Sequence, residues 1–284
     1  MNTNTTPPNP SFTDATGPSV PTLVLVHGAW HGGWCWQRVQ PLLQAQGLVS
    51  HAVTLTGVGE RAHLLSGQIR LSTHVADVLG LIDTLELAHV LLVGHSYGGL
   101  VITGVADLLL QRQAAHAQAV AAGAAPGTPV TRLSGLVYVD AVTPHPGESW
   151  SSQHTPDTVA GRRQLALERG AGVAIPPPDS AAFGLEGADR DWVNRRQTPQ
   201  PLGVYQDALH FNAAAVATLP RTFIDCTQPA LPTIAVMRQR VRTEPGWTVH
   251  ELATGHDPMV SAPHDLARLL ALAVQGQRSA VESC

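Results

Sequence analysis

Hydrophobic positions along this chain form short continuous runs separated by longer stretches with helical spacing. Apolar runs typical of buried strands cover residues 22–28, 50–57, 89–94, 133–141, 221–227 and 246–252. Between them, apolar residues recur every three or four positions, as in the stretches 34–47, 73–87 and 262–274. Strands that alternate with helices predict a mostly parallel sheet with helices on both faces, so we expect an α/β fold.

Two stretches interrupt this alternation. Residues 111–131 are alanine-rich and of low complexity, and we expect them to extend a helix and then turn. Residues 141–220 are far too long for an ordinary connection and contain several aromatic residues. We interpret them as a mostly helical cap or lid inserted into a core of residues 20–140 and 221–276, the alternative being a purely structural excursion. Residues 1–19 are polar and dotted with proline, which predicts a mobile tail.

Composition excludes several classes of protein. The chain has 284 residues, enough for one large domain, and its formal net charge of -4 gives no basic surface for nucleic acid. The three cysteines have no paired spacing, which favours a reducing compartment. The N-terminus has no signal-peptide pattern and no apolar run is long enough to span a membrane. We therefore expect a cytoplasmic protein without membrane contact, and the sequence leaves a homodimer open.

The stretch "LLVGHSYGGLV" (91–101) contains the first chemical signal. Here Ser96 fits the pattern G-x-S-x-G, in which a sharp strand-to-helix turn lifts a nucleophilic serine above a sheet. A glycine-rich turn with an incidental serine is the alternative. The pattern predicts that Ser96 is a nucleophile.

Other chemical groups are expected at the carboxyl ends of the strands, where parallel sheets bind ligands. The glycine-rich loop "HGAWHGGW" (27–34) follows the first strand, and we predict an oxyanion hole from the backbone N–H groups of Ala29 and Tyr97. Two histidines four apart, His27 and His31, also allow a zinc site on paper, but the glycines around them oppose the helix it would need. His256 follows the last strand, which matches the chain order serine, acid, histidine and predicts the general base.

Five motifs together resemble one protein family. The motifs "HGAWHGGWCW", "GHSYGG", "LTGVGER", "VDAVTPHPGES" and "TGHDPM" are similar to those of the esterase and hydroxynitrile-lyase branch of the α/β-hydrolase superfamily. This branch includes methylesterases of the salicylate-binding-protein type and bacterial carboxylesterases. The resemblance covers about residues 20–275. It implies Ser96 as nucleophile, His256 as base, a cap after the fourth predicted strand, a small-molecule ester substrate, and no metal or cofactor.

The sequence leaves more than one candidate for the acid of the catalytic triad. Family members commonly hold it in the loop after the strand at 221–227, but that loop reads Gln228-Pro229-Ala230 here. Asp140 ends its strand at the carboxyl edge of the sheet, whereas Asp225 lies within a strand. We favour Asp140; the alternatives are Asp225, or that neither carboxylate serves.

Three functions follow from the resemblance. A carboxylic-ester hydrolase uses the full triad and an acyl-enzyme, with an apolar cleft for small, fairly apolar esters. Hydroxynitrile lyases of this branch carry threonine where Gly28 stands and lysine where Asp257 stands, which opposes the lyase. A non-catalytic ligand receptor should lack a triad member, yet Ser96 and His256 are both present. We therefore expect an esterase.

Overall fold

A parallel sheet forms the centre of the molecule. The computed structural model describes residues 20–123 and 130–282, so the predicted tail 1–19 lies outside the described residues. Within this part of the chain, the main sheet has six strands in the order β2-β1-β3-β4-β7-β8, and all neighbouring strands are parallel. The strands are β1 (Thr22–Val26), β2 (Ser50–Val53), β3 (His89–His95), β4 (Arg132–Val139), β7 (Arg221–Cys226) and β8 (Trp247–Leu252). All six coincide with the predicted apolar runs, and the predicted α/β fold class is confirmed.

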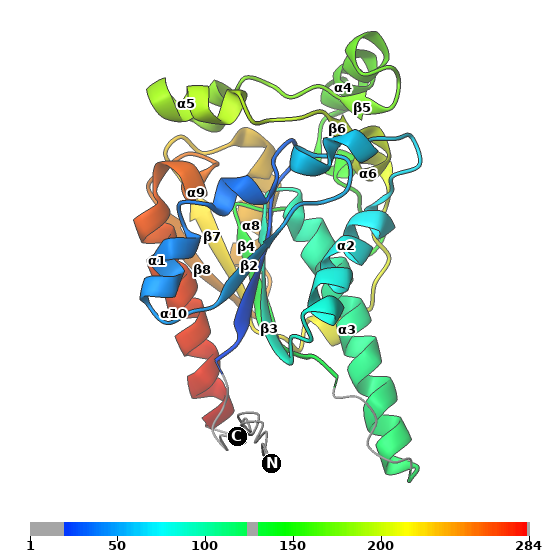
Figure 1. Ribbon diagram of the computed structural model, residues 1–284, viewed down its shortest axis with the longest axis vertical. Coiled ribbons are helices and arrows are strands. Elements are labelled where there is room, and N and C mark those ends of the chain that lie inside the picture. Colours follow the sequence, from blue (N-terminus) through cyan, green and yellow to red (C-terminus); the bar gives the residue numbers. More distant parts are fainter. Residues whose placement is uncertain (1–19, 124–129, 283–284) are drawn as a thin grey trace, which may run out of the picture.

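Helices cover both faces of this sheet (Figure 1). The long helices are α2 (Leu71–Thr84), α3 (Gly98–Ala121) and α10 (Pro263–Glu282). The shorter ones are η1 (Gly33–Trp36), α1 (Gln40–Ala45), η2 (Gly59–Leu64), η5 (Pro232–Ile234), α8 (Ala235–Thr243) and α9 (Pro258–Ser261). In Figure 1, α2 and α3 lie on one side of the sheet, while α1 and α10 lie on the other.

Side chains of each central strand alternate between two hydrophobic cores. On β3, Val90 and Leu92 pack into the core under α2 and α3, whereas Leu91 and Val93 pack into the core under α1 and α10. This alternation follows from the period of two along a strand. A strand buried on both faces needs apolar residues at every position, which explains why the sequence showed continuous runs rather than alternating ones.

The segment between β4 and β7 is built from many short elements. They are η3 (Ser151–Gln153), α4 (Pro156–Arg169), β5 (Ala174–Ile175), η4 (Ser180–Phe183), α5 (Gly187–Asn194), β6 (Gln200–Pro201), α6 (Leu202–Gln206) and α7 (Ala213–Val216). The strands β5 and β6 pair in an antiparallel ribbon that the sequence did not predict. In Figure 1, these elements lie beyond the same end of the main sheet, with α5 on the left and α4, α6 and the ribbon on the right.

Three other segments refine the sequence-based prediction. The helix expected over 34–47 is divided into η1 and α1, and Pro41 lies in the first turn of α1, where its missing N–H is tolerated. Helix α8 was not predicted. The alanine-rich stretch extends α3 to Ala121 as expected, while residues 124–129 lie outside the described residues. Among the described helices, none is both long enough and apolar enough to cross a membrane.

Candidate active site

Ser96 lies in a sharp turn between β3 and α3. Its φ of 52° is in the left-handed region, which is uncommon for a residue other than glycine. The turn is held by hydrogen bonds from Ser96 N–H to Val139 O (3.2 Å) and from Val142 N–H to Ser96 O (3.0 Å). A Cβ on Gly99 would lie 2.1 Å from the Val142 carbonyl oxygen, so only glycine allows this approach. The turn has the geometry of a nucleophile elbow, with Ser96 partly exposed at its tip.

His256 connects Ser96 with Asp140. Its Nε2 lies 2.9 Å from Ser96 Oγ, and its Nδ1 lies 2.7 Å from Asp140 Oδ2. With a carboxylate as the partner of Nδ1, the neutral ring carries its proton there, and Nε2 can accept the Ser96 hydroxyl proton. The structure therefore brings together the three residues that the sequence analysis selected.

Asp225, the alternative acid, has a different set of partners. Its two carboxylate oxygens accept from Arg238 Nε (2.5 Å) and Arg242 Nη2 (2.7 Å). The guanidinium of Arg238 also donates from Nη2 to Asp140 Oδ1 at 2.9 Å. Arg238 thus donates to both carboxylates, and Asp140 is the one that contacts His256.

Arg238 is a supporting residue that the sequence analysis missed. It lies on α8, and its side chain reaches β7 and the end of β4. By donating to one oxygen of Asp140, it leaves the other oxygen for His256. The sequence "MRQRVR" (237–242) contains three arginines, but nothing in it indicates which of them turns toward the sheet.

The loop after β1 places its N–H groups beside Ser96. In the described chain, the N–H groups of Ala29 and Tyr97 donate to no carbonyl or side chain. The carbonyl of the peptide that contains the Ala29 N–H, Gly28 O, accepts from His27 Nδ1 at 2.7 Å, and His27 Nε2 accepts from Leu55 N–H at 3.1 Å. Since N–H and C=O point in opposite directions across a trans peptide, His27 directs the Ala29 N–H away from itself.

Burial and the neighbouring protein groups keep His27 neutral. Its side chain is fully buried, and desolvation lowers its pKa to about 3 despite the hydrogen bond to Gly28 O. A neutral ring has one donor and one acceptor nitrogen, which is what these two contacts need. The structure thus gives His27 a hydrogen-bonding role in the loop after β1.

Gln200 is a second residue that the sequence analysis missed. It lies on β6, is fully buried, and accepts the N–H of Trp30 on its Oε1 at 2.9 Å. Trp30 itself has a φ of 64°, and its indole Nε1 donates to Ile175 O at 3.0 Å. The segment between β4 and β7 therefore directly supports the loop after β1. A contact across 170 positions leaves no local signal in a sequence.

A further buried cluster lies behind His256. His31 Nε2 is 3.2 Å from Asp257 Oδ2, and His95 Nε2 donates to the carbonyl oxygen of His256 at 2.8 Å. His95, His256 and Asp257 each offer one ligand atom within 4.8 Å of the others. The ring of His95 already bonds to the carbonyl of His256, and the ring of His256 bonds to Asp140 and Ser96. These hydrogen bonds account for the proximity of the three residues. The ring nitrogens of His27 and His31, the pair considered from the sequence, lie within hydrogen-bond distance of Gly28 O, Leu55 N, Ala29 O and Asp257 Oδ2.

Ser96 and His256 open into a cavity of about 220 Å³. Its lining is mostly apolar and aromatic, and much of it comes from the segment between β4 and β7. The lining residues include Trp30, Val142, Trp150, Phe183, Leu231 and Ile234, with Gln153, His154 and Arg162 as polar members.

Arg162 is the cation in this lining. Its guanidinium lies over three rings, those of Trp150 (4.8 Å to the centroid), Tyr205 (5.1 Å) and Trp30 (5.5 Å). Burial together with the charge of Arg162 lowers the pKa of His154 to about 4, so this neighbour is neutral. Within the described chain, no carboxylate lies at ion-pair distance from Arg162.

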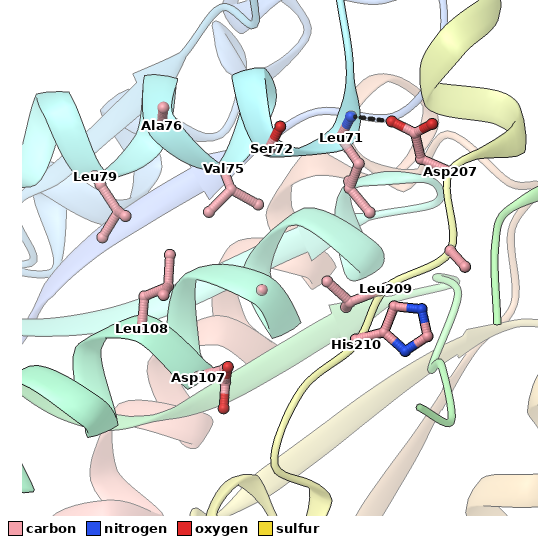
Figure 2. Close-up of a pocket in the computed structure, with 12 residues that line it drawn as sticks. Leu71, Ser72, Val75, Ala76, Leu79, Asp107, Leu108, Asp207, Leu209 and His210 are labelled. Atoms are coloured by element: carbon pink, nitrogen blue, oxygen red, sulfur yellow. Dashed lines mark hydrogen bonds between the residues drawn. The ribbon is translucent and has the colours of Figure 1, made fainter. Parts of the chain in front are cut away.

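A larger cavity lies elsewhere, between α2, α3 and residues 207–210. Its volume is about 510 Å³, and Figure 2 shows leucine and valine side chains along its length. Its carboxylates are occupied by protein donors: Asp207 accepts from Leu71 N–H at 2.9 Å, and Asp107 accepts from Asn212 N–H at 3.0 Å. Because Ser96 and His256 do not line it, we assign the chemistry to the smaller cavity.

Comparison with known proteins agrees with this geometry. Residues 23–269 match the model of the alpha/beta hydrolase family. A carbendazim hydrolyzing esterase from Nocardioides sp. (strain SG-4G) is 38% identical over 259 residues, which cover 88% of this chain and 98% of that protein. A pyrethroid hydrolase from Sphingobium wenxiniae is 29% identical over 262 residues, covering 89% and 87%. Among solved structures, an extracellular alpha/beta-hydrolase from a Paenibacillus species has a TM-score of 0.72 at 19% identity, covering 89% of this chain and 98% of its own, which shows the shared fold.

Proposed function

Because this chain belongs to the alpha/beta hydrolase family, we propose that it hydrolyses carboxylic esters with Ser96 as nucleophile, His256 as base and Asp140 as the triad acid. The observation that supports this most directly is the hydrogen-bonded series Ser96–His256–Asp140, with two free backbone N–H groups beside Ser96. The esterase and hydrolase activities of its full-length relatives support the same reaction.

In the first half of the reaction, the Ser96 hydroxyl gives its proton to His256 Nε2 while Oγ attacks the ester carbonyl carbon. The N–H groups of Ala29 and Tyr97 stabilise the developing oxyanion, and each such donor is worth about 3–4 kcal/mol in comparable sites. Asp140 stabilises the imidazolium through its bond to Nδ1. The intermediate then collapses, the C–O bond to the alcohol breaks, and the alcohol leaves with the proton from His256.

In the second half, a water molecule replaces the alcohol. His256 takes one proton of the water as the hydroxide oxygen attacks the acyl carbon, and the bond to Ser96 Oγ breaks as that proton returns to Ser96. The products are a carboxylic acid and an alcohol. Every step uses groups of this chain and water.

Two alternative functions fit the site less well. A threonine at position 28, which the hydroxynitrile lyases of the branch carry, would place its Cβ 2.7 Å from His95 Nδ1 and 2.8 Å from Ser96 Cβ. Asp257, where those lyases have lysine, faces His31 and does not line the cavity. A receptor without turnover would have no need for the aligned hydroxyl, imidazole and carboxylate.

The cavity lining supports a small, fairly apolar ester with a flat or aromatic part. Trp30, Trp150 and Phe183 offer ring faces and edges, and the cavity of about 220 Å³ admits only a compact group. The names of the carbendazim hydrolyzing esterase and the pyrethroid hydrolase suggest carbendazim and pyrethroids as the first compounds to test beside simple esters. We also propose a cytoplasmic location, since the described cysteines Cys35 and Cys226 are free and buried.

Labelling with a fluorophosphonate tests the proposal. We expect the reagent to modify Ser96, located by mass spectrometry, and to abolish hydrolysis of p-nitrophenyl acetate. Ser96→Ala should resist labelling, lose turnover and keep its melting temperature, because the hydroxyl is at the tip of the turn. Turnover retained in Ser96→Ala would assign the nucleophile to another residue.

A further inference from the structure

Asp257, the residue after the proposed base, belongs to a second buried histidine–carboxylate pair. Its Oδ2 lies 3.2 Å from His31 Nε2, and both side chains are buried. On the other side of the same ring, His31 Nδ1 lies 2.7 Å from the carbonyl oxygen of Ala29. The imidazole of His31 therefore bridges the loop that contains His256 and the loop that contains the proposed oxyanion donor.

The two partners of His31 determine its protonation state. A carbonyl oxygen and a carboxylate oxygen only accept hydrogen bonds, so a ring that bonds to both must carry a proton on each nitrogen. Burial alone would lower the pKa of His31, but the charge and hydrogen bond of Asp257 outweigh burial and raise it. Burial would likewise raise the pKa of Asp257, yet His31 lowers it to about 2. The pair is thus an imidazolium and a carboxylate at neutral pH.

Three other titratable groups around the pair, His95, His27 and Cys35, are held neutral by burial. His95 has its Nε2 3.5 Å from Asp257 Oδ1, but burial and the nearby His256 lower the pKa of His95 well below its ordinary value. Burial holds His27 neutral as well, and burial together with Asp257 raises the pKa of the Cys35 thiol. His256 hydrogen-bonds to Asp140 and Ser96 rather than to Asp257. The charge therefore resides on His31 and Asp257.

The peptide between Ala29 and Trp30 is held from both sides. Its carbonyl accepts from His31, and its N–H donates to Gln200 Oε1 at 2.9 Å. These bonds support the unfavourable φ of 64° at Trp30, and they fix the peptide next to the Ala29 N–H. Loss of the His31 bond would free one side of this peptide.

We propose that His31 and Asp257 are positioning residues. As an imidazolium–carboxylate pair, they hold the loop after β1, which contains the proposed oxyanion donor Ala29 N–H, in place relative to His256. This inference rests on the proposed esterase function, because it assigns the pair to the oxyanion site of that reaction. The two residues act through Ala29, and they touch neither the substrate nor the reacting atoms.

The charge on His31 can be measured without any substrate. In a ¹⁵N-labelled wild-type protein at pH 7, the His31 ring should give the imidazolium pattern in a histidine side-chain ¹⁵N spectrum, assigned by its loss in His31→Asn or His31→Gln. In Asp257→Asn the pattern should change to that of a neutral ring. A neutral His31 in the wild type would overturn the proposal, whether or not the protein is an esterase.

Kinetics test the positioning role. Asp257→Asn should lower kcat for p-nitrophenyl acetate between about 10- and 100-fold with little change in KM. In the wild type, kcat should decrease at alkaline pH as His31 loses its proton, and in Asp257→Asn this decrease should occur at lower pH. Asp107→Asn is the matched control, because it removes another buried carboxylate, which lines the larger cavity rather than the one at Ser96. A pH profile of Asp257→Asn that superimposes on those of the wild type and the control would show a purely structural role. Phosphonate labelling of Ser96 in the same samples separates this failure from failure of the esterase proposal.

Discussion

At the scale of single residues, Asp140 and Asp225 are two buried carboxylates that share the guanidinium of Arg238. We expect Asp140→Asn to lower kcat by about 10⁴-fold, as in the best-studied triad of this kind, because the amide favours the wrong tautomer of His256. Asp225→Asn should act mainly on stability, with a loss of roughly 3–5 kcal/mol from unpaired buried charge. Because Arg238 keeps its bond to Asp140, the loss of kcat should stay below about tenfold. Steady-state kinetics and melting temperatures of the two variants check these predictions. A large loss of kcat in Asp225→Asn, with only a loss of stability in Asp140→Asn, would assign the role of the acid to Asp225.

Gly99 offers a separate test of the turn at Ser96. In Gly99→Ala the new methyl group would lie 2.1 Å from a backbone oxygen, so we expect the turn to shift, and both activity and melting temperature to fall. Gly161→Ala is the control, since a Cβ there meets nothing within 4 Å in helix α4. That substitution should stabilise the protein by roughly 0.5–1 kcal/mol. Equal melting temperatures for the two variants would contradict this account of the turn.

The three candidate residues that the structure brings together share a local signature. Ser96 stands in a glycine pattern, and His256 and Asp140 follow predicted strands, so strand order alone brings them to one edge of the sheet. Arg238 and Gln200 have no such signature, because they reach the site through side chains that cross between distant segments. Tertiary placement of a long side chain cannot be predicted from spacing.

At the scale of elements, the strands were predictable, whereas the individual short elements between β4 and β7 were not. Six runs of apolar residues are unambiguous because each strand is buried on both faces. The inserted segment consists of elements as short as two residues, which carry no period. This segment also cannot be regarded as detachable, since Phe183 O accepts the N–H of His256 at 2.9 Å and Gln200 holds Trp30. A single substitution is therefore a better test of its function than a deletion.

Arg162 is the residue of α4 that links this segment to the cavity. We expect Arg162→Met to remove the stacking over Trp30, Trp150 and Tyr205 and to reshape the lining. The variant should change the ranking of kcat/KM among compact aromatic esters by several-fold while altering acetate esters little. Competition assays on an ester panel measure this ranking. Arg163→Met, a change at the exposed neighbour, is the control, and an identical ranking in both variants would assign Arg162 a structural role alone.

At the scale of the whole molecule, buried histidines couple stability to pH. Burial lowers the pKa of His27 to about 3 and that of His74 to about 4, and the pKa of His95 lies well below its ordinary value. In the unfolded chain each of these residues titrates near 6.5. As the pH falls below about 6.5, the unfolded state binds protons that the folded state excludes, so the folded state loses stability. His31 acts in the opposite direction, because its raised pKa stabilises the folded state below 6.5.

His74 allows this coupling to be measured one residue at a time. Its ring is fully buried, with Nδ1 3.0 Å from Tyr97 Oη and Nε2 2.9 Å from Thr56 O, a pattern that a neutral ring satisfies. The pKa of His74 is about 4 in the folded state and near 6.5 in the unfolded chain. Urea unfolding of the wild type at pH 7, 6, 5 and 4.5 should therefore give a free energy of unfolding that decreases steadily as the pH falls. In His74→Gln that fall should be smaller by up to roughly 1.4 kcal/mol per pH unit, even if the variant is less stable at pH 7. His264→Gln, a change at an exposed position of α10, should keep the wild-type slope. If all three proteins lose stability at the same rate, the acid sensitivity comes from groups other than the buried neutral histidines.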